Sequence, residues 1–273
     1  MKIASYNIEN MFLRARALNG ATFAEGREIL KAHADINRIL GKDTYTAADK
    51  TKIVSLLDAL GLKKSDESKF AILRQNRGKL VKRPQGGPPQ IVADGRSDWI
   101  GWVDLSLMEV NEVATRNTAQ VIRDLEADVL GVVEAESRPA LLRFSDNVLP
   151  AVGGDPYEHI MLIDGNDERG IDVGLMTREQ FDIVSIRSHV DDEDDDGIVF
   201  SRDCAQYEIR TANGNTLIVL INHYKSKGFG SQSDSNKKRQ RQAARTADIY
   251  KKLQQQHEFI AILGDLNDTP DST

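Results

Sequence analysis

Five polar residues stand where apolar stretches of the sequence end, and their side chains suit chemistry on a phosphate ester. Glu134 directly follows DVLGVV, and His223 follows TLIVLIN. Asp265 and Asn267 come just after FIAIL, and Asn7 lies within SYNIEN near the first residue. Each of them alone fits an ordinary role, such as a solvated loop carboxylate, a packed histidine or an Asx turn. Because ligand sites of α/β sheets form at the carboxyl ends of strands, we interpret the set as one site.

The types of these side chains favour a hard divalent cation. Two carboxylates and two amides, with no thiolate, suit Mg²⁺, which binds through one or two carboxylates and keeps several waters. Mn²⁺ and Ca²⁺ are the alternative ions, and the sequence shows no His/Cys cluster typical of structural zinc. A cation beside an imidazole and amides suits phosphoester hydrolysis, in which the ion polarises the phosphoryl oxygen and the donors stabilise developing charge.

The elements that must position these residues read as alternating strands and helices. Compact apolar runs without polar alternation predict strands covered on both faces, and they lie at residues 3–8, 129–133, 173–176, 217–221 and 259–263. Amphipathic patterns predict helices at residues 111–127 and 235–256, each just ahead of a strand. The predicted fold class is therefore α/β.

Residues from about 14 to 109 have a different pattern. Two amphipathic segments, 24–40 and 46–62, precede a predicted hairpin at 70–83 and the breaker PQGGPPQ. We see no internal repeat and no linker long enough to separate two domains. We therefore expect a single domain over 1–273 that carries a large insertion at about 14–109.

Composition and charge limit the functional classes. The chain has 36 Lys and Arg against 42 Asp and Glu, a net charge of −6, which argues against indiscriminate nucleic-acid binding. Between Lys225 and Arg245, however, there are seven basic residues and one acidic residue. This excess of positive charge suits either a phosphate-bearing ligand or a solvated helix face. Cys204 is the only cysteine, and neither a signal peptide nor a membrane-spanning run is present. We expect a cytoplasmic protein without a membrane partner.

Several motifs together are similar to those of a known family. ASYNIENMF, DVLGVVEAES, RGIDVGLMTR, LINHYKSKG and ILGDLNDTP resemble, in order and in position at strand ends, the endonuclease/exonuclease/phosphatase superfamily with its DNase I-like fold. The resemblance covers residues 1–11 and about 111–270 and leaves the insertion outside. It implies a two-sheet α/β sandwich flanked by helices.

The resemblance also implies roles for the residues at the strand ends. Glu134 matches the metal-binding glutamate of the family, and Asn7 matches the asparagine that contacts the metal or its water shell. His223 matches a histidine that donates to the scissile phosphate. Asp265 matches the aspartate that orients the attacking water, and Asn267 matches the amide that steadies the transition state.

Further residues are expected around this set. Asp172, in RGIDVGLM, matches the acid that supports the histidine of the family, so we expect it among the catalytic residues. Arg202, in FSRDC, is expected to reach a phosphate. Asn222, Lys225 and Lys227 flank or follow His223, and we expect them to bind substrate.

The sequence departs from the family pattern after Asp265. The family has a further Ser-Asp-His-like motif whose histidine activates the water, and no such motif follows here; His257 precedes the last predicted strand. We therefore expect the fold to be incomplete at its C-terminus, the natural chain to continue, and these 273 residues alone to be weakly active or inactive.

Three functions remain open at this point. The first is a Mg²⁺-dependent phosphodiesterase, most plausibly a nuclease acting on DNA or RNA. The second is a non-catalytic module that binds metal or phosphate but lacks the water-activating histidine. The third is a phosphomonoesterase of the same family. The basic stretch Lys225–Arg245 fits all three.

Overall fold

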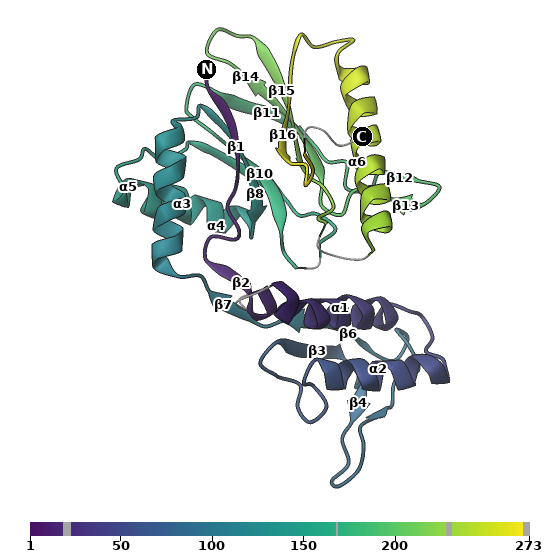
Figure 1. The fold of residues 1–273 in the computed structure, drawn as a ribbon. Coiled ribbons are helices and arrows are strands. Elements are labelled where there is room, and N and C mark those ends of the chain that lie inside the picture. Colours follow the sequence, from purple (N-terminus) through teal and green to yellow (C-terminus); the bar gives the residue numbers. More distant parts are fainter. Residues whose placement is uncertain (19–22, 168, 228–230, 270–273) are drawn as a thin grey trace. The chain divides into compact units, whose positions relative to one another are not determined.

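The computed structural model describes residues 1–18, 23–167, 169–227 and 231–269 (Figure 1). The chain divides into two compact units. The first, called here the main unit, consists of Met1–Phe12 and Val110–Thr273. The second, called the inserted unit, is Leu13–Glu109.

Within the described residues, the first sheet of the main unit has four strands in the order β1-β8-β10-β9. β1 runs parallel to β8, and the other neighbours are antiparallel. The strands are β1 (Ile3–Asn7), β8 (Val129–Ala135), β9 (His159–Ile163) and β10 (Asp172–Thr177).

The second sheet also has four strands in the part of the chain that the structure describes, in the order β11-β14-β15-β16. Its last pair, β15 and β16, is parallel and its other pairs are antiparallel. The strands are β11 (Asp182–Arg187), β14 (Cys204–Arg210), β15 (Thr216–His223) and β16 (Phe259–Asp265). A two-stranded hairpin, β12 (Glu193–Asp194) and β13 (Gly197–Ile198), precedes β14.

The two sheets pack face to face with helices outside (Figure 1). One buried cluster joins Val133 and Leu175 of the first sheet to Val219 of the second. The outer face of the first sheet is covered by α3 (Glu112–Leu125), α4 (Arg138–Arg143), η2 (Phe144–Val148) and α5 (Leu149–Ala151). The outer face of the second is covered by α6 (Gln232–Leu253). The main unit is thus the predicted DNase I-like α/β sandwich.

The sequence accounts for these elements. VLGVV is buried on both faces of its strand, as a run without polar alternation predicts. Asn111 begins α3 by accepting a hydrogen bond from the Val113 N–H, and Ser231 caps α6 in the same way. All five predicted strands and both predicted helices of the main unit are confirmed.

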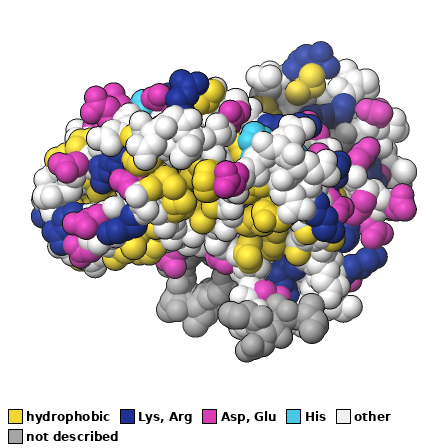
Figure 2. All heavy atoms as spheres, turned by 90° about the horizontal axis from the view of Figure 1, so that it is seen from above, with side chains coloured by type: hydrophobic (Ala, Val, Ile, Leu, Met, Phe, Trp, Pro, Cys, Tyr) yellow, Lys and Arg dark blue, Asp and Glu magenta, His cyan; other side chains and the backbone are white. Residues whose placement is uncertain are grey.

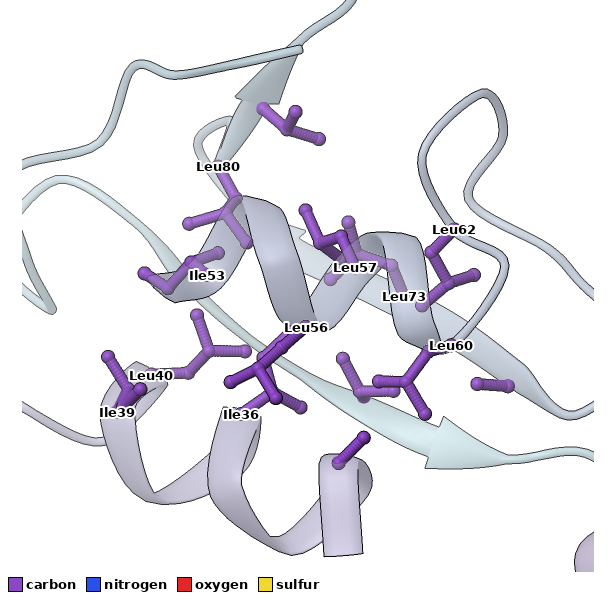
Figure 3. Close-up of a cluster of buried hydrophobic side chains, with 14 of the residues drawn as sticks. Ile36, Ile39, Leu40, Ile53, Leu56, Leu57, Leu60, Leu62, Leu73 and Leu80 are labelled. Atoms are coloured by element: carbon purple, nitrogen blue, oxygen red, sulfur yellow. The ribbon is translucent and has the colours of Figure 1, made fainter. Parts of the chain in front are cut away.

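The inserted unit has a core of its own, formed by two helices and short strands. α1 (Phe23–Leu40) and α2 (Ala47–Ala59) pack onto a two-stranded sheet (Figure 3). That sheet pairs β3 (Ala71–Arg77) with β6 (Ile100–Leu105). The remaining elements are η1 (Arg16–Leu18), β2 (Leu13–Ala15) paired with β7 (Leu107–Glu109), and β4 (Val81–Lys82) paired with β5 (Gln90–Ile91).

The predicted hairpin at residues 70–83 is wrong. β3 pairs with β6 rather than with β4, because Leu80 and Val81 are fully buried and turn the chain into the core. The two predicted helices of this unit are confirmed, and α2 begins at the capping box of Thr46 and Asp49.

Apolar side chains are also exposed. β16, which has β15 as its neighbour among the described strands, exposes Phe259 and Ile262, and Leu266 follows it. Figure 2 shows hydrophobic side chains gathered in the middle of one face, with charged side chains around them. Of the helices described, none combines the length and the apolar character that crossing a membrane requires.

Candidate functional site

Four of the predicted site residues meet where strands of the two sheets end. Asn7 ends β1 and Glu134 is the second-to-last residue of β8, while His223 and Asp265 end the neighbouring strands β15 and β16. Asn7 Nδ2 donates to Asp265 Oδ2 at 3.3 Å, and His223 Nε2 lies 3.8 Å from Glu134 Oε1. Both contacts join one sheet to the other. The end of the sandwich therefore brings two carboxylates, an amide and an imidazole together.

Glu134 occupies a β-bulge. Val173 pairs with Val133 and Asp172 pairs with Ala135, which leaves Glu134 without a partner in the β10 ladder. Its φ of 63° is in the left-handed region, a costly conformation for a residue with a side chain. Bulges are a common device for redirecting a side chain near an active site. The backbone is thus arranged to turn this carboxylate away from the ladder.

Burial raises the pKa of Glu134, although the Asn7 amide and the charges of Arg202 and Arg169 oppose the shift. Its side chain is three-quarters buried, and its nearest basic atom is the His223 ring nitrogen at 3.8 Å. Burial without a close cationic partner disfavours the ionised carboxylate. A bound cation would reverse that penalty at this position.

His223 is buried and uncharged near pH 7. Burial, followed by the charge of Arg202, lowers its pKa to about 3. The contact with Glu134 is therefore no ion pair, and 3.8 Å is too long for a hydrogen bond. His223 Nδ1 is buried and has no hydrogen-bond partner within the described ranges of the chain. A neutral imidazole carries one N–H donor and one acceptor, so this ring can donate to a ligand oxygen.

Asp265 is held by the turn that follows it. The Asn267 backbone N–H donates to Asp265 Oδ1 at 2.8 Å, while Asn7 occupies the other oxygen. Asn267 itself has a φ of 52°, and its Nδ2 donates to the Tyr224 carbonyl. Gly264 is required before this turn, because a Cβ there would lie 1.9 Å from the Asn222 carbonyl oxygen. These constraints fix the direction of the Asp265 carboxylate.

Two arginines supply positive charge close to this set. Arg169 Nε donates to Asp167 Oδ1 at 2.7 Å, and Arg202 Nε lies 2.9 Å from Asp167 Oδ2. Two guanidinium groups on one carboxylate leave an excess positive charge, which acts on both Glu134 and His223. All three side chains are largely buried. This arginine pair is suited to an anionic ligand.

Arg202 was expected from the sequence, whereas Arg169 and Asp167 were missed. The available signal was their position in NDERGIDVG, a charged stretch directly before β10. A loop before a strand gives no indication of which side chains turn inward, so the pairing of Arg169 and Arg202 across 33 positions could not be derived.

Asp172 lies beside this cluster with a different partner from the one expected. Its Oδ1 accepts from the Gly165 N–H at 2.7 Å, and in the part of the chain that the structure describes no hydrogen bond joins it to His223. Burial raises the pKa of Asp172 to about 6. Asp172 is thus placed within the electrostatic reach of Arg202 rather than against the histidine.

The expected substrate-binding residues are placed differently from one another. Asn222 is fully buried on the opposite side of β15 from His223, and its Oδ1 accepts from Thr246 of α6. The structure therefore does not bring Asn222 to the site. Lys225 lies near the arginine pair, since burial and the charges of Arg202 and Arg169 lower its pKa to about 8. Lys227 pairs with Asp268 at 2.7 Å.

The basic stretch of α6 is largely neutralised within the main unit. Arg245 pairs with Asp192 at 2.7 Å and Lys237 with Asp196 at 2.9 Å. Arg241 binds Asp194 in the same acidic hairpin, and Arg239 pairs with Asp268 at 3.1 Å. Both interpretations of this stretch from sequence are therefore incomplete, because much of its charge is used to hold the acidic hairpin on the helix.

A cavity of about 1070 Å³ opens beside Asn7 and Asp265. Its wall is formed by the end of β1, the residues that follow β16, and polar side chains of α6, with Lys227 at one side. A volume of this size can accept a ligand larger than a phosphate group.

The donor set fits a magnesium-type ion. Among the described residues no group of three or more His, Cys, Asp and Glu side chains is arranged to hold a metal. Mg²⁺ does not require such a cage, because it binds through one or two carboxylates, waters and substrate phosphates. Glu134, with the Asn7 amide and the Asp265 carboxylate beside it, offers the oxygen donors of that kind of site.

Comparisons with known proteins agree with the sequence motifs. The model of a family described as "Endonuclease/Exonuclease/phosphatase family" matches residues 98–273. No curated protein matches the chain.

Three similar solved structures illustrate the range of relatives. A mannosyl-6-phosphatase of Bacteroides thetaiotaomicron is 19% identical, with a TM-score of 0.39 over 56% of this chain and 55% of that one. The human Nocturnin catalytic domain is 12% identical, with a TM-score of 0.43 over 57% and 58%. Truncated Caenorhabditis elegans TDP2 is 16% identical, with a TM-score of 0.42 over 57% and 56%. The matched part of this chain thus spans little more than half the length of each.

Proposed function

Because the chain belongs to the Endonuclease/Exonuclease/phosphatase family of phosphoester hydrolases, we propose that it serves as a cation-dependent phosphodiesterase acting on nucleic acid. The observation that carries this proposal is the meeting of Glu134, Asn7, His223 and Asp265 beside two arginines. A site with carboxylates alone would repel a phosphate. A site with arginines alone would bind a phosphate but would not activate water. The combination supports hydrolysis.

Glu134, with Asn7 and Asp265 next to it, would hold the divalent cation. Mg²⁺ bound there would act as a Lewis acid on a phosphoryl oxygen. The bulge at Glu134 and its raised pKa support this role, because a buried carboxylate gains most from a cation. Mn²⁺ and Ca²⁺ would be accommodated by the same oxygen donors.

The remaining side chains would act on the phosphate and the water. Neutral His223 would donate to a phosphoryl oxygen, and the Arg169–Arg202 pair would stabilise the negative charge on the phosphate. Asp265, whose two oxygens are fixed by Asn267 and Asn7, would orient the attacking water. Each role uses a group that the fold already holds in place.

The test is hydrolysis by this chain and by any longer product of its gene. Bis-(p-nitrophenyl) phosphate and labelled DNA and RNA strands serve as diesters, and p-nitrophenyl phosphate as the monoester, with Mg²⁺ or EDTA. We expect EDTA to abolish diester hydrolysis and Glu134→Gln to lower it at least ~100-fold. Glu179→Gln, an exposed matched control, should leave it unchanged.

Each other outcome changes the proposal in a defined way. Hydrolysis that is unchanged both in EDTA and in the Glu134→Gln variant would contradict the assignment of the active site to Glu134. Cleavage of the monoester alone would identify a phosphomonoesterase of the same family. Metal binding without turnover on any of these substrates would identify a non-catalytic binding module.

A further inference from the structure

The inserted unit differs from the main unit in charge. Leu13–Glu109 contains 17 Lys and Arg against 12 Asp and Glu, a net charge of +5. The remaining residues contain 19 against 30, a net charge of −11. Such asymmetry within one chain is typical of proteins that use one part to bind a polyanion.

The β3–β6 sheet has one buried face and one open face. On one face, Leu73 packs into the core with α1 and α2 (Figure 3). Val103, which pairs with Leu73 across the strands, belongs to the same buried cluster. The open face presents three cross-strand pairs, Ile72 with Asp104, Arg74 with Trp102 and Arg77 with Ile100. Within the described residues this sheet has two strands. The side chains of its open face are not members of the buried core cluster of this unit.

Trp102 stands at the centre of this open face. It is 45% exposed, whereas Trp99, the only other tryptophan, is fully buried in the core. Trp102 Nε1 donates to Asp104 Oδ1 at 2.5 Å, and Arg74 Nε donates to Asp104 Oδ2 at 2.8 Å. One carboxylate therefore holds an indole and a guanidinium side by side on the surface. An exposed ring held in this way contributes little to burial and is well suited to stack on a flat ligand.

The positive charges around Trp102 are weakly neutralised. Arg77, on the same face, donates to the carbonyls of Ser97 and Arg96 and forms no ion pair with any described residue. Lys79, between β3 and β4, and Lys82, in β4, are exposed and likewise have no ion pair in the described ranges. This differs from α6, where acidic side chains bind most of the basic ones.

We propose that the open face of the β3–β6 sheet binds single-stranded nucleic acid, with a base stacked on Trp102 and phosphates against Arg77 and Lys79. An aromatic ring within a basic surface is the combination that binds single strands without sequence preference. An acidic peptide would satisfy the charges but would leave the indole without a function. The proposal does not depend on hydrolysis at the main unit.

The experiment titrates the full chain with a 12-nucleotide oligothymidylate in EDTA, followed by tryptophan fluorescence and by anisotropy of a labelled strand. Stacking on Trp102 should quench the exposed tryptophan and leave buried Trp99 emission in place. Trp102→Ala should weaken binding about 5- to 150-fold, and Trp102→Phe should weaken it less, because a phenyl ring still stacks.

Charge variants provide a second readout. Arg77→Gln and Lys79→Gln should each lower the slope of log K against log salt by about 0.7, the value for one phosphate contact on a single strand. Lys52→Gln removes the same charge from the exposed side of α2, across the core, and should leave the slope unchanged.

Three results would overturn the proposal. The first is an unchanged affinity for the oligonucleotide in a Trp102→Ala variant that melts like the wild type. The second is an equal slope of log K against log salt in Lys52→Gln and Arg77→Gln. The third is binding of poly-glutamate that is as tight as binding of the oligonucleotide. Glu134→Gln should bind the oligonucleotide like the wild type. Binding with no hydrolysis would therefore leave this inference intact while removing the proposed function.

Discussion

At the scale of single residues, the candidate site places ionisable groups where burial opposes their charge. Burial raises the pKa of Glu134 and of Asp172, and it lowers the pKa of His223 to about 3. Such perturbed groups gathered in one place are typical of functional sites. The consequence is that the site reduces the stability of the fold, and this loss can be measured.

Asp172 gives the clearest stability prediction. Its pKa rises from 3.8 to about 6 on folding, so between these values the folded chain holds a proton that the unfolded chain has released. Stability must therefore fall as pH rises through this window. Asp172→Asn, which keeps the acceptor for Gly165, should raise the free energy of unfolding at pH 7.5 by up to about 3 kcal/mol.

The gain should disappear below about pH 4, where both states of the wild type are protonated. Urea unfolding at a series of pH values measures it, with exposed Asp155→Asn as the matched control. A gain in the free energy of unfolding that does not depend on pH, or that is equal in the two variants, would contradict this account. It would show that burial of the ionised Asp172 carboxylate does not destabilise the fold.

At the scale of elements, backbone irregularities at strand ends position the site. The bulge at Glu134 and the left-handed Asn267 both follow regular strand. Gly264 is the most restrictive of these positions, because the strand passes so close to Asn222 that a Cβ has no room. The element therefore depends on a residue without a side chain.

Gly264→Ala tests that dependence against a matched control. Gly214 shares a positive φ, but a Cβ there meets nothing within 4 Å. Gly214→Ala should cost only the strain of the left-handed backbone, of order 1 kcal/mol. Gly264→Ala should cost at least about 2 kcal/mol more, because the β15 backbone must move. Equal losses in thermal or urea unfolding would show that the close approach is not limiting.

Element boundaries also explain what could be predicted. An apolar run that stops at a polar residue predicts both a strand and the place where it ends, so the positions of Glu134, His223 and Asp265 at strand ends could be predicted from sequence. The strands β11 and β14 mix polar and apolar residues and were missed. The strand β9, which is apolar after His159, was missed as well. Asn222 was expected at the site because it is next to His223 in the sequence. Successive residues of a strand point to opposite faces of the sheet, so Asn222 points away from the site.

Interactions between segments that are distant in the sequence could not be predicted from the sequence pattern. The Arg169–Asp167–Arg202 cluster and the binding of the acidic hairpin to α6 both depend on how loops pack. The 70–83 hairpin failed for the same reason, since the partner of β3 lies beyond the Pro/Gly-rich turn. Sequence pattern defines elements, whereas these pairings are set by tertiary packing.

At the scale of the whole molecule, the chain passes between the two units at two neighbouring positions, after Phe12 and after Glu109. Leu13 pairs with Glu109 at the edge of the inserted unit, and the Val110 N–H donates to the Phe12 carbonyl at 2.7 Å in the main unit. The buried cluster of the inserted unit has no residue in common with those of the main unit. The ends left by removing the inserted unit thus already lie together.

Replacing residues 13–109 by Asn-Gly should therefore leave a folded main unit, because a two-residue turn suits an antiparallel pair. Circular dichroism and a cooperative thermal transition measure folding, and ANS fluorescence detects a loosely packed product. The shortened chain should lose the oligonucleotide binding that is measured in EDTA and keep divalent-cation binding. A product that binds ANS and melts without cooperativity would show that the main unit requires the inserted one.

The most direct test of the central claim, that Glu134 is the centre of a divalent-cation site, is a Mn²⁺ titration followed by the EPR signal of the free ion. The wild-type chain should bind one Mn²⁺ that Mg²⁺ displaces. Glu134→Gln should weaken that binding at least ~10-fold, while Glu179→Gln should not change it. Mn²⁺ binding of equal strength in the wild type and in Glu134→Gln would contradict the account.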